Sequence, residues 1–163
     1  MSLRARIVEL VEQDRRDELA EIVADEPRAV RHLVSFTYRP ETAVRATACY
    51  GMGVAARHHP EFTQQVLRRL VWAMNDESGT NALTAPEVVK AVADVRPELL
   101  VPLVPDLMRL AADEGLQEGL AAALRRIIEQ CPGTVGRGIE DSLNKKFAKV
   151  AKRRKKYGNR RRG

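Results

Sequence analysis

Four prolines recur along the chain at nearly constant spacing, and this period constrains the fold more than any other feature. They stand at positions 27, 60, 97 and 132, so the intervals are 33, 37 and 35 residues. Each proline follows one helix-like segment and opens another. This position suits proline, because a backbone N–H in the first turn of a helix has no intrahelical partner and proline has no N–H to leave unpaired. A period of this length predicts stacked helical hairpins.

Apolar residues between these prolines recur at three- and four-residue spacing, as expected for amphipathic helices. One such stripe is formed by Val66, Leu67, Leu70, Val71 and Met74. The helices expected before the prolines cover about 17–25, 42–58, 85–95 and 116–131. Those expected after them cover about 27–37, 60–75, 97–113 and 134 onward, and a capping helix is expected over about 3–13.

Individual residues refine these helices. Pro102 and Pro105 should break or kink the segment 97–113. Gly51 and Gly53 lie inside a helix, where each would cost about 1 kcal/mol, so we expect a neighbouring helix to approach closely there. Thr84 and Glu87 have the spacing of a capping box before the helix at 85–95.

The composition favours an all-α fold. Apolar residues make up 44% of the chain but aromatic residues only 4%, and the abundance of Ala, Leu and Val suits tight helix packing. No apolar run approaches the roughly 20 residues that a membrane span needs, and the N-terminus does not resemble a signal peptide. We therefore expect a cytoplasmic protein.

Neither the cysteines nor the histidines form a recognisable ligand set. Cys49 and Cys131 are isolated from each other and are expected to be reduced core residues. His58 and His59 are adjacent at a helix end, and His32 is remote from them, so a helix-end role is expected instead of a metal site. The sequence predicts no metal and no cofactor.

The net charge of +6 is divided very unevenly along the chain. Residues 145–163 hold 11 of the 28 Lys and Arg residues and no acid, so residues 1–144 hold 17 basic and 22 acidic residues, a net charge of −5. Two regions are therefore expected: a helical repeat domain over 1–144, and a basic extension over 145–163 that is helical at first and then disordered.

Several segments resemble one family of helical repeat proteins. They include Val34–Tyr38, Val44–Ala46, Arg68–Trp72, Asn75–Gly79 and Ala85–Glu87. The chain resembles small prokaryotic HEAT-like proteins whose repeats are named after phycobilisome lyases. The resemblance covers about residues 27–131 and is most specific in the NDESG and APE motifs.

This resemblance implies an α-solenoid of about four helical hairpins and supplies no reaction. The family pattern continues after NDESG with a glycine-rich stretch that contains Trp, whereas this chain has Thr80-Asn81-Ala82-Leu83. A site that depended on that Trp is therefore not expected here.

The longest predicted loop and its flanking helix ends form the first candidate site, for a ligand or a partner. Its residues are Trp72, Asn75, Asp76, Glu77 and Glu87. A structural interpretation competes with this one: Asn75 to Gly79 can end a helix with an ordinary turn, Glu87 can act as a cap, and Trp72 can pack between helices.

An enzymatic interpretation of the same residues is also open. Trp72 and Asp76 are four positions apart, so they share a helical face and could hold a cationic base as in HEAT-like DNA glycosylases. The chain has only one Trp, however, and no further aromatic residues nearby to stack an extruded base.

The basic extension is the second candidate site. Ile139, Leu143, Phe147 and Val150 or Ala151 continue the last helix with a narrow apolar seam and a basic outer face. Nucleic acid, including structured RNA, is the first partner to consider, since phosphates attract such a segment strongly. The candidate residues are Lys145, Lys146, Lys149, Lys152, Arg153, Arg154, Lys155, Lys156, Arg160, Arg161 and Arg162.

Other roles for this extension stay open at the level of the sequence. An anionic membrane surface would attract the same charges, although the segment lacks a broad hydrophobic face. An acidic protein surface, including residues 1–144 of this chain, and a purely solubilising tail are further alternatives.

Together these patterns predict a non-catalytic binding or scaffold protein. Its repeat surface would bind a protein partner while the basic extension contacts nucleic acid. The alternative is an enzyme or enzyme maturation factor with a site near Trp72 to Glu87. The oligomeric state is left open.

Overall fold

Helices are the regular secondary structure of the described part of the chain, and turns connect them. The computed structural model describes residues 1–75, 84–113, 115–133 and 136–158, and no strand occurs among them. The elements are α1 (Leu3–Glu12), α2 (Arg16–Asp25), α3 (Ala29–Phe36), α4 (Thr42–His58), α5 (Pro60–Asn75), α6 (Ala85–Val95), the 3-10 helix η2 (Pro97–Leu103), α7 (Val104–Leu110), α8 (Gln117–Gln130) and α9 (Arg137–Gly158).

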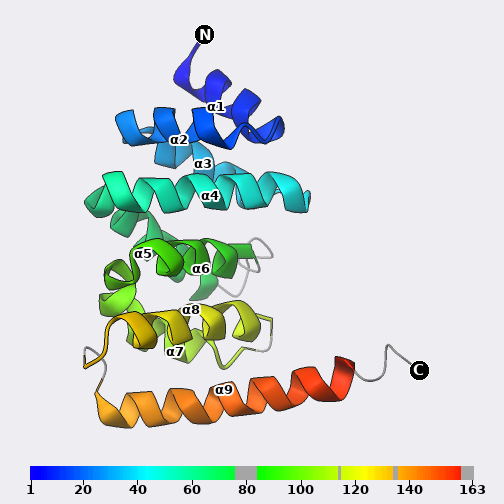
Figure 1. Cartoon of the computed structure of the whole chain (residues 1–163), viewed down its shortest axis with the longest axis vertical. Coiled ribbons are helices and arrows are strands. Elements are labelled where there is room, and N and C mark those ends of the chain that lie inside the picture. Colours follow the sequence, from blue (N-terminus) through cyan, green and yellow to red (C-terminus); the bar gives the residue numbers. More distant parts are fainter. Residues whose placement is uncertain (76–83, 114, 134–135, 159–163) are drawn as a thin grey trace.

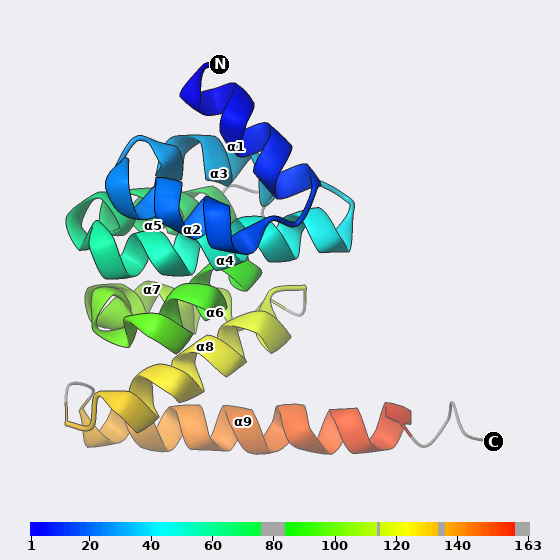
Figure 2. The ribbon, with the colours of Figure 1, turned by 45° about the horizontal axis from the view of Figure 1, so that its top comes forward.

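The helices are arranged in successive layers along the long axis of the molecule (Figure 1). α2, α4, α6 and α8 form one row, in which each helix packs extensively on the next. α3, α5 and the η2–α7 pair lie behind this row. α1 covers one end by packing on α2, α3 and α4, and α9 lies across the other end, against α8 (Figure 2).

A continuous apolar core runs through all these layers. Leu10, Leu33, Leu67, Leu107 and Ile127 come from five different helices, and each is completely buried. Burial of a side chain of this size contributes roughly 1.5 to 3 kcal/mol. The core therefore holds the layers together along the whole stack.

The proline spacing predicted the helix boundaries well. α5 begins at Pro60, and α6 spans the predicted segment from Ala85 to Val95. The expected break within 97–113 is also confirmed, because a 3-10 helix that contains Pro102 precedes an α-helix with Pro105 in its first turn.

Close packing explains the glycines inside α4, as predicted. A Cβ on Gly51 would lie 2.9 Å from Leu33 Cδ1, and one on Gly53 would lie 3.3 Å from Val95 Cγ2. The tightest approach was not predicted: a Cβ on Gly119 would lie 2.5 Å from Pro86 Cβ, where α8 crosses the start of α6. Glycine therefore lets successive layers approach closely.

The two cysteines are both free but differ in burial. Cys49 is buried in α4, and burial raises the pKa of its thiol to about 12. Cys131, which follows α8, is only partly buried, so its assignment to the core is wrong. The helix ends at Gln130, and the chain already turns toward the surface at that point.

Among the described residues, no helix combines the length and the apolar character that a membrane span requires.

Candidate functional site

Trp72 is the most exposed aromatic side chain described, with 75% of its surface accessible. The interpretation that it packs between helices is therefore wrong. The reason is the register of α5. At 100° per residue, Trp72 lies about 160° around the helix from Leu70 and from Met74, which are both buried. Trp72 thus lies on the outer face of α5.

Asn75 completes the end of α5 and joins it to α7. Its Nδ2 donates to the Val71 carbonyl at 3.1 Å. Its Oδ1 accepts from Arg109 Nη2 at 3.3 Å, and the same nitrogen donates to Asp106 Oδ1 at 2.9 Å. These bonds give Asn75 a structural role between two helices.

Glu87 is bound by an arginine from another layer. Its two carboxylate oxygens accept from Arg45 Nε at 3.1 and 3.3 Å. Arg45 is only 14% exposed and also donates through Nη1 to the carbonyls of Arg39 and Pro40, at 2.9 and 2.8 Å. The two residues therefore connect α4 to α6.

The predicted capping box is consequently wrong. Thr84 stands at the N-cap of α6, but its side chain makes no capping hydrogen bond, and its backbone is already helical. Pro86 and the residues that follow suffice to start the helix there. Asp76 and Glu77 lie outside the described residues, so the structure brings together no complete cluster at 72–87.

His59 lies at the end of α4, as the sequence predicted, but its ring contacts the end of a different helix. Its Nε2 lies 2.8 Å from the carbonyl oxygen of Val23, in the last turn of α2. A histidine N–H donated there satisfies a carbonyl that the helix itself leaves unpaired. Within the described residues no three His, Cys, Asp or Glu side chains are grouped as metal ligands.

The second candidate site lies on α9. Leu143 is 1% exposed and attaches this helix to α8, as the predicted apolar seam requires. The side chains of Ile139, Phe147, Val150 and Ala151 lie outside the described part. The described lysines of the helix are all exposed: Lys145, Lys149, Lys152, Lys155 and Lys156.

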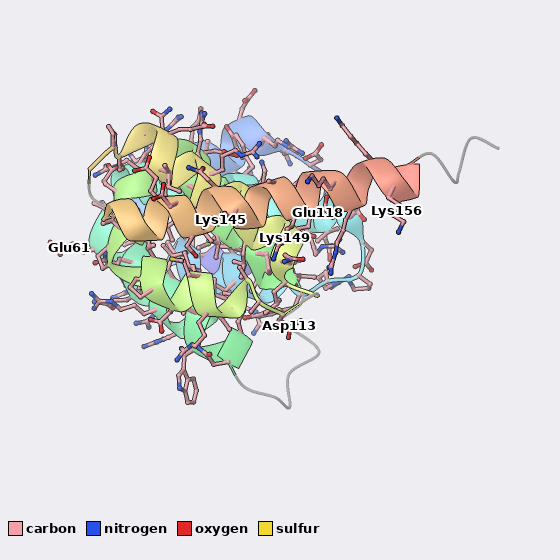
Figure 3. All side chains as sticks on the ribbon, turned by 90° about the horizontal axis from the view of Figure 1, so that it is seen from below. Glu61, Asp113, Glu118, Lys145, Lys149 and Lys156 are labelled. Atoms are coloured by element: carbon pink, nitrogen blue, oxygen red, sulfur yellow. The ribbon has the colours of Figure 1, made fainter. Side chains whose placement is uncertain are left out.

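Four of these residues form a single row, which we call the lysine stripe: Lys145, Lys149, Lys152 and Lys156. Their spacing of four, three and four residues keeps them within about 60° of arc and about 16 Å of helix length. Leu143 stands on the opposite side of the helix, about 160° from Lys145. Figure 3 shows α9 across the end of the molecule with three of these lysines labelled.

The remaining predicted basic residues divide into two groups. Lys155 and Arg153 are exposed on the same helix, and Arg153 has a contact of its own. The side chains of Lys146 and Arg154, and all of Arg160, Arg161 and Arg162, lie outside the described part. The geometry of this candidate site therefore rests on the exposed side chains of Lys145, Lys149, Lys152, Arg153, Lys155 and Lys156.

Basic side chains elsewhere in the molecule differ from those of α9 in their ion pairing. Most basic side chains of the layers form ion pairs, namely Arg6, Arg15, Arg16, Arg39, Arg45, Lys90, Arg96, Arg109 and Arg126. The five exposed lysines of α9 form none with any described residue. No described acidic side chain therefore neutralises their positive charge.

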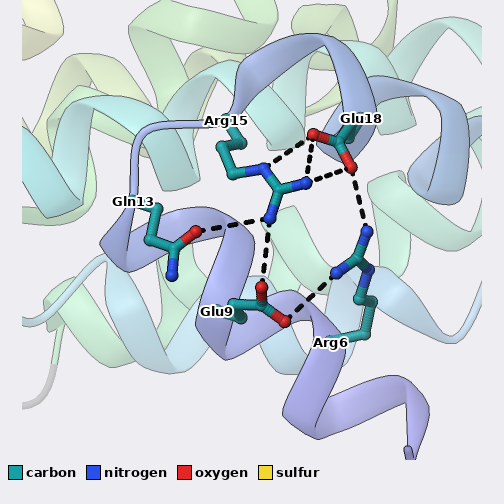
Figure 4. Close-up of polar contacts among 5 residues, drawn as sticks. All are labelled: Arg6, Glu9, Gln13, Arg15 and Glu18. Atoms are coloured by element: carbon teal, nitrogen blue, oxygen red, sulfur yellow. Dashed lines mark hydrogen bonds and ion pairs between the residues drawn. The ribbon is translucent and has the colours of Figure 1, made fainter.

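An ion-pair network at the other end of the molecule was not predicted from the sequence. Glu9 accepts from Arg6 at 3.1 Å and from Arg15 at 3.0 Å, and Glu18 accepts from Arg6 at 2.9 Å and from Arg15 at 2.6 Å (Figure 4). The two arginines and two glutamates thus form a closed, neutral ring between α1 and α2. The spacing of Arg6 and Glu9 was a local signal for it, whereas the link to Glu18 depends on the angle between the helices.

α9 is also longer than the helix that supports it. It has 22 residues, or about 33 Å, whereas α8 has 14 residues, or about 21 Å. Figures 1 and 2 both show the C-terminal end of α9 extending past α8 and clear of the other helices. We call the residues 152–156 the distal segment; all of its described side chains are exposed.

No protein-family model matches the chain, and neither a curated protein nor a solved structure matches it. The resemblance to HEAT-like proteins therefore stays a prediction.

Proposed function

We propose that this chain is an α-solenoid of HEAT-like hairpins that acts as a non-catalytic binding scaffold and attaches to nucleic acid through α9. One observation carries the proposal: α9 presents exposed lysines that no acidic side chain of the described fold neutralises. A polyanion that binds there would release its condensed counterions, which is the main source of affinity for nucleic acids.

The layered arrangement supports the scaffold part of the proposal. Rows of helices that contact mainly their neighbours present extended surfaces, as helical repeat proteins do. Exposed Trp72 adds an aromatic side chain of the kind enriched in protein interfaces. The described polar members of the loop cluster at 72–87, Asn75 and Glu87, link helices through arginines, so they give no support to a catalytic site there.

Salt dependence tests the attachment to nucleic acid. The full chain and the triple variant Lys152→Gln, Lys155→Gln, Lys156→Gln are titrated against labelled oligonucleotides at several salt concentrations. We expect the chain to bind and the variant to bind more weakly, with a slope of log K against log salt that falls by up to about 3 units.

A matched control removes the same charge from the layers. Arg4, Arg28 and Arg57 are exposed and form no ion pair with any described residue, so changing them to Gln alters the net charge equally. This control should keep the affinity and the slope. Equal loss in both triple variants, or no binding by the native chain, would refute the role of α9; binding to anionic vesicles instead would favour a membrane partner.

A further inference from the structure

We propose that α9 recognises double-stranded DNA of the B form, with its distal segment in the major groove. This inference rests on the proposed function and names the class of nucleic acid. It is carried by three features of α9: the straight lysine stripe, the spread of basic side chains around the distal segment, and the extension of the helix past α8.

The lysine stripe matches a rigid polyanion. It places four positive charges along about 16 Å of straight helix. The same length of duplex axis carries about nine phosphate charges, already held in a fixed line. A single strand would first have to be straightened, which has a conformational entropy cost for each residue ordered.

The distal segment has basic side chains on more than one side. Relative to Lys152, Lys156 is rotated by about 40° and Arg153 by about 100°, whereas Lys155 is rotated by about 60° in the opposite sense. The three exposed lysines alone therefore span about 100° of the circumference, and Arg153, which has a contact of its own, lies beyond them. A helix inside a groove meets phosphates on both walls, and this spread provides charges toward both.

The dimensions of the major groove favour a DNA duplex over an RNA duplex. The major groove of B-form DNA is about 12 Å wide and admits an α-helix, whereas the major groove of A-form RNA is deep and narrow. The C-terminal end of α9 extends past α8 and clear of the other helices, so no described helix lies alongside it there (Figures 1 and 2).

Recognition of single strands usually adds a stacking surface of exposed aromatic side chains. Among the described side chains, the exposed aromatic ones are Tyr50 and Trp72. They belong to α4 and α5, which do not pack on α9. The described side chains around α9 thus provide charge without a stacking surface, which favours a duplex over a single strand.

The first experiment compares ligands with the unmodified chain. Fluorescence anisotropy is measured at about 0.1 M salt with a 20-base-pair DNA duplex, the RNA duplex of the same sequence, and each single DNA strand. We expect the DNA duplex to bind at least about tenfold more tightly than the others. Equal or tighter binding of RNA or single strands would overturn the inference and leave the proposed function standing, whereas no binding to any ligand would refute the proposed function itself.

The second experiment separates groove insertion from general attraction. The double variants Lys152→Gln, Lys156→Gln and Lys145→Gln, Lys149→Gln remove the same charge from the same stripe. We expect the distal pair to reduce DNA affinity several-fold more than the pair beside α8. Circular dichroism checks that both variants keep their helices, and equal losses would contradict insertion.

Chemical footprinting then identifies the groove. Dimethyl sulfate methylates guanine N7 in the major groove and adenine N3 in the minor groove. With the unmodified chain at saturation, guanine N7 should be protected while adenine N3 stays reactive. The reverse pattern, or protection of neither atom, would refute the placement in the major groove.

Discussion

The two ends of the molecule carry similar numbers of charged residues near their terminal helices but use them in opposite ways. At the N-terminal end, Arg6, Glu9, Arg15 and Glu18 neutralise one another in a closed ring between α1 and α2. At the C-terminal end, the exposed lysines of α9 form no ion pair with a described residue. Charge thus fixes the packing of helices at the N-terminal end, whereas the exposed lysines at the C-terminal end have no described acidic partner.

The attachment of the terminal helices differs in the same sense. α1 packs on α2, α3 and α4, whereas α9 packs chiefly on α8. Leu143 is the one buried side chain described in α9. The N-terminal end is therefore built into the stack, and the C-terminal end is held on it by a narrow apolar contact.

The largest effect is expected from Leu143→Ala, which weakens that contact. Loss of the buried side chain should destabilise the docking of α9 by about 2 to 3 kcal/mol, since truncation of a buried leucine leaves a cavity. Because α9 has chiefly one neighbour, the effect should stay local. Hydrogen exchange should rise in α9 and stay unchanged in α1.

Lys149→Ala is the control for this variant, because it shortens an exposed side chain of the same helix. It should leave exchange in α9 unaltered. If Leu143→Ala unfolds the whole chain cooperatively, or leaves α9 as protected as before, the contrast between the two ends is wrong.

A smaller effect is expected from Glu18→Gln, which opens the ring at the N-terminal end. Arg6 and Arg15 would then share Glu9. Because the side chains of the ring are about one third exposed, the free energy of unfolding should fall by at most about 1 kcal/mol. Urea unfolding measures it, and the effect should shrink at about 1 M salt through screening. Lys149→Gln also removes one charge but breaks no ion pair, so it should not lower stability at either salt concentration.

The smallest effect concerns the turn between α1 and α2. Asp14 accepts a hydrogen bond from buried Thr47 and pairs with Arg16, and these contacts hold the pKa of its carboxyl below the ordinary value of 3.8. A carboxyl with a lowered pKa stabilises the fold above its unfolded value and loses that contribution as the pH falls through the folded value.

Asp14→Asn should therefore lower the melting temperature at neutral pH. The difference in melting temperature between the variant and the native chain should disappear below pH 3.8. Asn tolerates the positive φ of 53° at this position, so backbone strain is not added. Asp141→Asn is the control at the other end, because Asp141 forms no hydrogen bond or ion pair with a described residue. A gap for Asp14→Asn that stays constant with pH would exclude this titration.

Much of the fold could be predicted because its signals are local. The prolines mark helix starts within a few residues, and three- and four-residue apolar spacing identifies the buried faces. The outward position of Trp72 was also encoded locally, since it stands opposite the apolar stripe of α5. The contacts at Glu87 were not predictable in this way, because its partner Arg45 is 42 positions earlier and meets it only when α4 and α6 stack.

In the candidate sites, too, some features follow from the local sequence and others depend on how distant segments pack. The exposed face of α9 follows from the positions of its lysines relative to Leu143, and sequence alone predicted it. The length by which α9 exceeds α8 depends on where both helices end and how they cross, so only the structure shows it. Likewise, the spacing of Arg6 and Glu9 suggests one ion pair, but a closed ring requires the turn at Asp14.

Because α9 packs chiefly on α8, the C-terminal helix could be exchanged for another helix. A terminal layer that touches chiefly one neighbour can be replaced without repacking the interior, provided that the replacement keeps an apolar side chain where Leu143 lies. An acidic or uncharged amphipathic helix grafted over 137–158 would then give the same stack of helices a terminal surface of different charge.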